Sequence, residues 1–377
     1  MEVSPSTILE GIVSFESTLC ETSVSFSSAS PESAGISPSS LRRAVETARV
    51  WGDQGHIVGA VMLVLRHDQV VLHEAVGWSD RERQLPMKTD TIFMMRSMTK
   101  PLVGTAILML QEEGRLKLRD RVSTYLPAFN NERSREITIY QLLTHTSGIT
   151  GSIVENHGPR YASLREAVDK VGLKGPEHPP GTRYEYSDPG SSTLGAVVAE
   201  VSGMPAEDFI RTRILEPIGM GDSFLDFKLR PGDPRAGRVA ASYRRENGES
   251  GSWIKSWDNT QPEEVPFFRA SGGLFAPAID YAKFLSCMLH GGRLANRRLL
   301  SEETVRLATN PSSLCKEYGL QWEIFGDKVF GHGGFQGTLS WVDKAHDLIG
   351  LYLTQSEQTG NATRPEFKRL VERAIVK

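Results

Sequence analysis

The stretch MRSMTKPLVGTAILMLQEEG, residues 95–114, constrains the fold of this chain more strongly than any other. As a helix from Met98 to Glu113 it is apolar on nearly every face, and Gly114 is a typical residue for its end. Pro101 stands in the first turn, where its missing N–H costs little. A helix that is apolar all round must be surrounded by other elements, so we expect it at the centre of a domain.

Two polar residues, Ser97 and Lys100, stand where this helix begins. Ser97 could be an N-cap and Lys100 a solvent-facing residue, or the hydroxyl and the amine could be paired so that one activates the other. The Ser-x-x-Lys pattern alone leaves both open, because the chain contains it three times: Ser97–Lys100, Ser252–Lys255 and Ser313–Lys316. Only the first pair opens a long apolar helix, which favours the catalytic interpretation there.

A helix N-terminus suits a nucleophile for physical reasons. Its unpaired N–H groups and positive potential can stabilise an oxyanion. A lysine one turn later projects to the same side as Ser97, and partial desolvation would lower the pKa of Lys100 so that it could accept a proton.

Bulk properties exclude some classes of function. The net charge is −3 and no long run of Lys or Arg occurs, so we expect no nucleic-acid partner. No apolar stretch approaches the roughly 20 residues of a membrane span. Oligomeric state is left open.

Location is expected to be cytoplasmic. Glu2, Glu10 and Glu16 are out of place in a secretory signal. The three cysteines, Cys20, Cys287 and Cys315, are odd in number and widely spaced, which argues against a disulfide framework.

The order of the predicted elements indicates an α/β (α+β) fold. A hairpin is predicted over residues 56–78 and three strands over 328–354, with helices between and at the ends, including one capped by Ser37. Short turns between neighbouring strands predict an antiparallel sheet flanked by helices. We expect residues 31–96 and 271–377 to form this discontinuous domain, 97–270 a mostly helical domain, the active site between them, and 1–30 a flexible N-terminal arm.

A second motif, PPGTRYEYSDPG at residues 179–190, contains Tyr186. Beside a lysine ammonium the phenolate of Tyr186 would be stabilised, so the residue could deprotonate a serine and later protonate a leaving group. In the alternative interpretation, Tyr184 and Tyr186 only pack this loop onto the core.

A third motif, FGHGGFQGTLSW at residues 330–341, contains His332, Gly333 and Gly334. The glycines would let a substrate lie along the strand edge, and the N–H of Phe335 could complete an oxyanion hole with that of Ser97. The alternative is a glycine-rich turn with His332 on the surface.

Together the three motifs resemble the serine β-lactamase and DD-peptidase superfamily, in particular its class C-like esterase branch (family VIII-type carboxylesterases). The phrases MRSMTKP, LLTHTSGI, PGTRYEYS, EPIGM, YGLQW and GHGG agree, and the resemblance runs from about Pro31 to the C-terminus. It implies that Ser97 is the acylated nucleophile, Lys100 its proton partner and Tyr186 the general base. It also implies substrate and oxyanion contacts from His332, Gly333, Gly334 and Phe335.

Two departures from the family pattern bear on the substrate. Asp188 stands where lactamases and peptidases commonly have asparagine, and His332 where they have lysine. Both changes weaken recognition of a carboxylate and an amide. We therefore expect a carboxylesterase acting on small or medium acyl esters or thioesters, without a cofactor.

Other interpretations remain open at this point. An acyltransferase or tailoring enzyme of secondary metabolism would pass the same acyl group to a bound acceptor. A β-lactamase, a D-amino-acid peptidase or a penicillin-binding-like sensor without turnover would share the motifs. An α/β-hydrolase and a metallohydrolase are disfavoured, because the chain has neither Gly-x-Ser-x-Gly nor His-Glu-x-x-His. His145 is more readily explained as a packed histidine than as a metal ligand.

Overall fold

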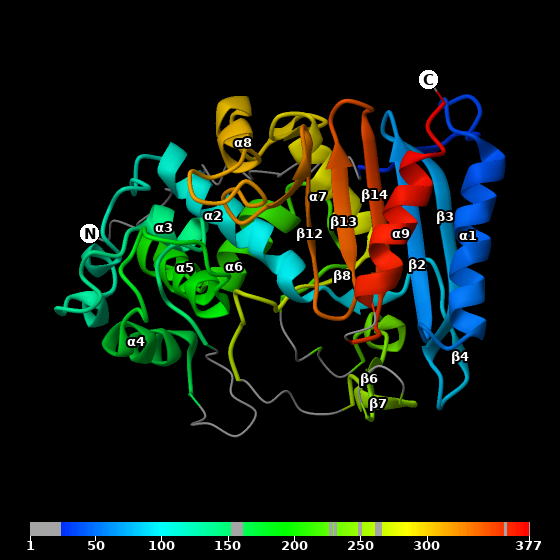
Figure 1. Cartoon of the computed structure of the whole chain (residues 1–377). Helices are drawn as coiled ribbons and strands as arrows, with labels where there is room; N and C mark the ends of the chain where they lie inside the picture. The colour runs from blue at the N-terminus through cyan, green and yellow to red at the C-terminus, as the bar shows by residue number, and fades with distance from the viewer. Residues whose placement is uncertain are drawn as a thin grey trace, which may run out of the picture.

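The computed structural model describes residues 24–151, 161–225, 229, 232–247, 251–260, 266–357 and 360–376. A twisted sheet lies on one side of the molecule and a group of helices on the other (Figure 1). This arrangement is the α+β class that the order of elements predicted.

The main sheet joins strands from both ends of the chain. The strands, in spatial order, are β1 (Ser27–Ser28), β3 (Gln69–Asp80), β2 (Gly59–Arg66), β14 (Leu348–Thr354), β13 (Leu339–Asp343), β12 (Val329–Gly333) and β11 (Glu323–Gly326), with β4 (Leu85–Pro86) beside β3. The predicted hairpin is β2–β3, and the three predicted C-terminal strands are β12, β13 and β14. The pairing of β14 with β2, from Leu348↔Arg66 to Thr354↔Ala60, closes the sheet across the chain.

Strand β2 is apolar along nearly its whole length because both of its faces are buried. Alternate residues contribute to the core shared with the helical side, namely Val61, Leu63 and Leu65. The residues between them contribute to the core under the outer helices, namely Ala60, Met62 and Val64. Side chains alternate across a strand, so a strand covered on both faces needs apolar residues at every position.

Helices cover both faces of the sheet. The α-helices of the described residues are α1 (Pro38–Asp53), α2 (Lys100–Glu112), α3 (Ile139–Leu143), α4 (Leu164–Lys174), α5 (Asp188–Ser202), α6 (Ala206–Ile210), α7 (Ala278–Leu289), α8 (Glu302–Ala308) and α9 (Gly360–Glu372). The pair α1 and α9 packs on the outer face, and α7 packs on the inner face (Figure 1). Three small two-stranded pairs complete the structure: β5 (Ile92–Met94) with β8 (Phe275–Pro277), β6 (Ser242–Arg245) with β7 (Trp253–Trp257), and β9 (Arg293–Leu294) with β10 (Arg297–Arg298).

Helix α2 is the central helix that its sequence predicted. Every residue from Lys100 to Leu110 is buried, and the helix packs mainly against α5. A Cβ at Gly104 would lie 3.1 Å from the carbonyl oxygen of Leu320, so the glycine permits a close approach of backbone to this helix. Gly114, at φ 72°, follows the helix as the predicted stop.

The N-terminal arm differs in part from the expectation. Ser27 and Ser28 pair with Gln69 and Val70, so the prediction of a flexible arm over residues 1–30 is wrong for them. This pairing is parallel, which makes the sheet mixed, whereas the other strand pairs of the main sheet are antiparallel as predicted. Residues 1–23 of the arm lie outside the described residues.

Among the described residues, no helix is long and apolar enough to cross a bilayer.

Candidate active site

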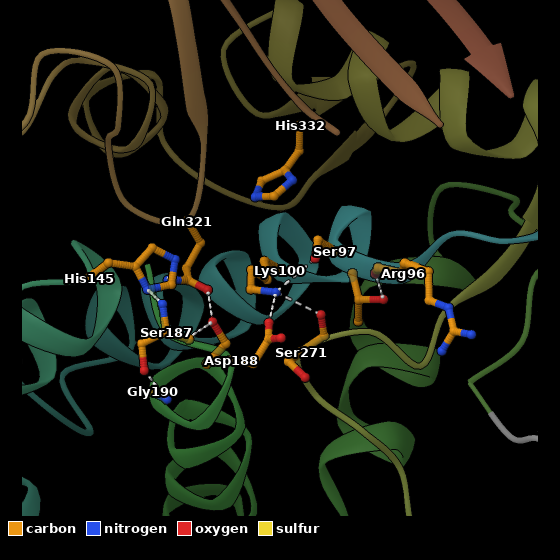
Figure 2. A network of polar contacts seen from close by, with 12 residues as sticks. Arg96, Ser97, Lys100, His145, Ser187, Asp188, Gly190, Ser271, Gln321 and His332 are labelled. Carbon is orange, nitrogen blue, oxygen red and sulfur yellow. Dashed lines mark hydrogen bonds and ion pairs between the residues drawn. The ribbon is translucent and has the colours of Figure 1, made fainter. Parts of the chain in front are cut away.

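Ser97 lies in a 3₁₀ turn, η1 (Arg96–Thr99), that leads directly into α2. Its side chain caps neither helix. Instead Ser97 Oγ accepts a hydrogen bond of 3.1 Å from Lys100 Nζ (Figure 2). The N-cap interpretation of Ser97 is therefore wrong, and so is a solvent-facing Lys100, whose side chain is 0% exposed.

Lys100 Nζ has three oxygen partners from three parts of the chain. Besides Ser97 Oγ it donates to Asp188 Oδ1 at 2.6 Å and to the Ser271 carbonyl at 2.9 Å (Figure 2). An ammonium has three N–H donors, so all of them are used. A neutral amine would keep two donors for Asp188 and Ser271 and turn its lone pair toward the hydroxyl proton of Ser97. The same partners thus fit both protonation states.

Burial lowers the pKa of Lys100 below its ordinary value, and the charge and hydrogen bond of Asp188 only partly oppose this. Desolvation penalises the ammonium because a buried charge loses its hydration. Asp188 is the first residue of α5, whose N-cap is Ser187. The Ser187 hydroxyl accepts the N–H of Gly190 at 2.9 Å, which fixes the turn that aims Asp188 at Lys100.

Tyr186 lies beside both residues. The side chain of Ser97 acts to lower the pKa of its phenol, and Lys100 Nζ lies 4.8 Å from the centre of its ring. Although 40% of Tyr186 is exposed, desolvation and then the charge of Asp188 raise its pKa well above the ordinary value. The expectation of a stabilised phenolate is wrong in direction. Desolvation and the carboxylate of Asp188 both act against the phenolate.

Strand β12 brings the third motif to the same place. A Cβ added to Gly334 would lie 2.6 Å from the Met95 carbonyl, so the strand end touches the turn that carries Ser97. Strand β11 pairs with β12 only as far as Gly331, so in the described part of the chain His332 and Gly333 have no partner strand on that edge. Only a residue without a side chain allows this contact between Gly334 and the turn.

Two backbone N–H groups near this contact are unpaired. Among the described residues, neither the N–H of Ser97 nor that of Phe335 has a hydrogen-bond acceptor. Phe335 directly follows Gly334 and is 57% exposed. Unpaired N–H groups beside a nucleophile are what an oxyanion hole requires.

His332 is 1% exposed, so the interpretation of a surface histidine is wrong. Its Nε2 lies 3.0 Å from the Tyr318 hydroxyl, and its Nδ1 lies 2.7 Å from the Gly333 carbonyl. The Tyr318 hydroxyl also lies 3.0 Å from His145 Nε2. His145 is a buried, packed histidine, as expected, and its ring centre lies 4.5 Å from that of Tyr186.

Sequence reasoning missed several contributors to the site. Ser271 acts only through its carbonyl, which any residue type possesses, so the sequence carries no signal for it. Asp188 was noted as a departure from the family but not as the partner of Lys100. Tyr318 and Gln321 lie in YGLQW, a phrase that matched the family without indicating what either side chain contacts.

The other two Ser-x-x-Lys pairs have ordinary surroundings. Lys255 forms an ion pair with Asp80 at 2.7 Å in the β6–β7 region. Ser313 and Lys316 are exposed. The burial of α2 distinguishes the first pair, as its apolar sequence predicted. No group of three or more metal-ligating side chains occurs among the described residues.

Comparison with known proteins identifies the family of this chain. The family model described as Beta-lactamase matches residues 41–373, and the chain therefore belongs to this family. The protein is a serine hydrolase.

Two sequence relatives and one solved structure are similar to this chain. Penicillin-binding protein 4 of Amycolatopsis lactamdurans is 28% identical over 298 residues, covering 75% of this chain and 76% of its own. Esterase EstB of Burkholderia gladioli is 33% identical over 183 residues, covering 44% and 46%. The structure titled EstCE1, a hydrolase with promiscuous acyltransferase activity, has a TM-score of 0.74 at 21% identity and covers 90% of this chain and 99% of its own. The last likeness concerns the fold alone.

Proposed function

We propose that this protein is a carboxylesterase that forms an acyl-enzyme on Ser97, with small or medium acyl esters as substrates. The observation that carries the proposal is the hydrogen bond of 3.1 Å from Lys100 Nζ to Ser97 Oγ, with the Tyr186 ring 4.8 Å from the same nitrogen. A hydroxyl between a lysine of lowered pKa and a protonated tyrosine has a proton acceptor and a proton donor at hand.

In acylation, Lys100 in its amine form accepts the hydroxyl proton while Ser97 Oγ bonds to the acyl carbon. The N–H groups of Ser97 and Phe335 stabilise the resulting oxyanion. The bond to the alcohol then breaks, and Tyr186 donates its proton to the departing oxygen. The ammonium of Lys100 returns a proton to Tyr186, so the net transfer is from Ser97 to the alcohol.

Deacylation follows the same proton path in reverse. Water takes the place of the alcohol, loses its proton through Tyr186 to Lys100, and bonds to the acyl carbon. The bond to Ser97 Oγ breaks and that oxygen recovers the proton from Lys100. Acid is released and the enzyme returns to its first state.

The charges of the site favour neutral acyl groups. Asp188 replaces an amide that could donate to a substrate carbonyl. Burial lowers the pKa of His332, so the position of the family lysine carries a neutral ring. Anionic groups of β-lactams and peptide stems then lose a cationic partner. The relative named Esterase EstB supports an ester substrate.

The second candidate is acyl transfer to a bound alcohol or amine. It is supported by the fold shared with EstCE1, a hydrolase with promiscuous acyltransferase activity. Acyl-Ser97 would be the same, and the acceptor would replace water.

The test combines intact-protein mass with nitrophenol release from a short-chain nitrophenyl ester. Ser97→Ala is the test variant and Ser313→Ala, at an exposed serine of another Ser-x-x-Lys, is the control. We expect an acyl adduct and turnover in the parent and the control, and neither in Ser97→Ala. Equal turnover in Ser97→Ala would overturn the assignment.

The same assay separates the alternatives. Added alcohol that diverts product from acid to ester indicates acyl transfer. An adduct that persists without turnover indicates a sensor. Faster turnover of a cephalosporin or a D-alanyl peptide than of the ester would replace the esterase proposal.

A further inference from the structure

A directed chain of hydrogen bonds runs behind Tyr186. The Ser187 N–H donates to His145 Nδ1 at 3.2 Å, so this nitrogen is an acceptor and carries no proton. The neutral ring then has its proton on Nε2, which donates to the Tyr318 hydroxyl oxygen at 3.0 Å. The amide nitrogen of Gln321, 3.5 Å from His145 Nε2, uses its protons on the Leu142 and Leu143 carbonyls. Tyr318 is left to donate its own proton to His332 Nε2, also at 3.0 Å. His332 therefore carries its proton on Nδ1, which donates to the Gly333 carbonyl.

The direction of this chain is fixed by its first donor. A backbone N–H cannot accept a hydrogen bond, so each later proton position follows from the one before it. Within this series of hydrogen bonds Tyr318 contributes the single hydroxyl, which accepts one hydrogen bond and donates another. Replacing it by phenylalanine removes two hydrogen bonds but keeps the ring.

The two ends of this series of hydrogen bonds lie next to the proposed catalytic machinery. Ser187 directly follows Tyr186, and the His145 ring packs against Tyr186. His332 directly precedes Gly333 and Gly334, which lie against the turn of Ser97. Backbone pairing with β13 holds β12, and the Glu185 N–H donates to the His145 carbonyl, so the hydrogen-bond network adds side-chain contacts to this backbone frame.

We propose that Tyr318 is a positioning residue, which holds Tyr186 and the β12 strand end in register by fixing the tautomers of His145 and His332. This deepens the proposed function and rests on it, because it takes Ser97 and Tyr186 as reacting groups. It assigns a role to YGLQW and LLTHTSGI, two phrases that the proposed chemistry leaves unused.

The proposed hydrogen bonds require that His145 and His332 are both neutral. Protonation of His332 would remove the acceptor of the Tyr318 proton, and protonation of His145 would remove the acceptor of the Ser187 N–H. The groups that face the two rings from neighbouring elements are Lys100, Tyr184, Tyr186, Tyr318, Glu323 and Arg364. Burial opposes protonation of both rings, and the charge of Lys100 acts in the same direction on each. At His332 the carboxylate of Glu323, 3.5 Å from Nδ1, acts the other way.

The test compares Tyr318→Phe with Tyr184→Phe. The Tyr184 ring lies 5.7 Å from that of Tyr318, and its hydroxyl has no hydrogen-bond partner among the described residues. The first readout is the rate at which a fluorophosphonate modifies Ser97, followed by intact mass. In that reaction Ser97 Oγ bonds to phosphorus, fluoride leaves, and the hydroxyl proton passes to the base. It needs no ester turnover.

The second readout is the ¹⁵N spectrum of labelled histidines, assigned with His145→Gln and His332→Gln. In the parent we expect the Nε2–H form of His145 and the Nδ1–H form of His332, both neutral at pH 7. In Tyr318→Phe the His332 ring loses the donor that favours its neutral form, so its pKa should rise by about one unit.

Tyr318→Phe should slow Ser97 modification on the order of 10- to 100-fold, because small misplacements of reacting groups are costly. Tyr184→Phe should keep the parent rate. Equal rates in the two variants, or the opposite tautomers in the parent, would overturn the proposal. The parent spectrum decides this even if Tyr318→Phe does not fold.

Failure of the esterase proposal can be distinguished from failure of the Tyr318 proposal. A parent that reacts with the phosphonate but hydrolyses no ester contradicts the esterase assignment and leaves the two readouts for Tyr318 intact. A parent whose Ser97 does not react overturns both proposals.

Discussion

Lys100 Nζ and Asp188 Oδ1 form an ion pair of 2.6 Å in which the lysine side chain is fully buried and that of the aspartate is 51% exposed. The two partners therefore differ in hydration. The ammonium has lost its water and depends on three protein oxygens, whereas the carboxylate keeps contact with solvent. Burial therefore favours loss of the Lys100 proton, and Asp188 opposes that loss.

Asp188→Asn should extend activity toward acid. The carboxylate raises the pKa of both Lys100 and Tyr186, so its removal lowers both. The acid limb of kcat/KM should move to lower pH by about one to three units. A pH profile on the nitrophenyl ester measures this, with Asp169→Asn at a surface ion pair as control. An acid limb that stays in place would contradict Asp188 as the group controlling Lys100.

Lys100→Met should remove the proton acceptor with little change in side-chain volume. We expect a loss of about 10²- to 10⁴-fold in kcat, the usual contribution of general acid–base catalysis. Lys316→Met, at an exposed lysine of the third Ser-x-x-Lys, should keep the parent rate. Circular dichroism of both variants separates loss of chemistry from loss of fold. Full activity in folded Lys100→Met would remove Lys100 from the mechanism.

Tyr186→Phe should be more harmful to poor leaving groups than to good ones. Its proton is proposed to go to the departing oxygen, and nitrophenolate leaves without that help. The substitution should therefore lower kcat/KM for an ethyl ester by a factor that is at least about ten times the factor for a nitrophenyl ester. The control is Tyr184→Phe. The same ratio for both esters would argue against Tyr186 as the acid.

Two glycine variants test the packing of the sheet. A Cβ at Gly350 would lie 2.1 Å from Trp341 Cζ2 on the neighbouring strand, so Gly350→Ala should cost about 1–3 kcal/mol of unfolding free energy. Gly52, in α1, has open space around the same position, and Gly52→Ala should add about 0.5–1 kcal/mol. Urea unfolding measures both. A neutral Gly350→Ala would mean that Trp341 can move aside.

A surface pair should make stability depend on pH. His290 Nε2 lies 2.7 Å from Asp68 Oδ2. This hydrogen bond raises the pKa of His290, and its effect is larger than the opposing effect of burial. The stabilisation is fully present below the unfolded value of about 6.5 and is lost as pH rises through the folded pKa. Because both side chains are partly exposed, the effect should not exceed about 1 kcal/mol.

The measurement for this pair is the urea midpoint at about pH 6 and about pH 9, on either side of the titration. His290→Gln should reduce the difference between the two midpoints, and His56→Gln, at an exposed histidine, should leave it unchanged. An identical difference in His290→Gln would show that the pair does not contribute.

Patterns within single segments determined much of this protein. The all-round apolar face of residues 98–113 required a buried helix, and α2 is one. Alternation, turns and caps gave the β2–β3 hairpin, the three C-terminal strands and the start of α1 at Ser37. These features depend on backbone geometry and on which neighbouring side chains are buried, and both can be predicted from a short stretch of sequence. The motifs also carried the family, which the match over residues 41–373 confirms.

Only the tertiary structure decided the electrostatics of the site. The expected phenolate of Tyr186 was wrong because desolvation, and then the charge of Asp188, which is distant in sequence from Lys100, raises the pKa of Tyr186. The Ser271 carbonyl and the Tyr318 hydroxyl reach the site from other segments. A pKa depends on burial and on charges within a few ångströms in space, and those distances exist only after the chain has folded.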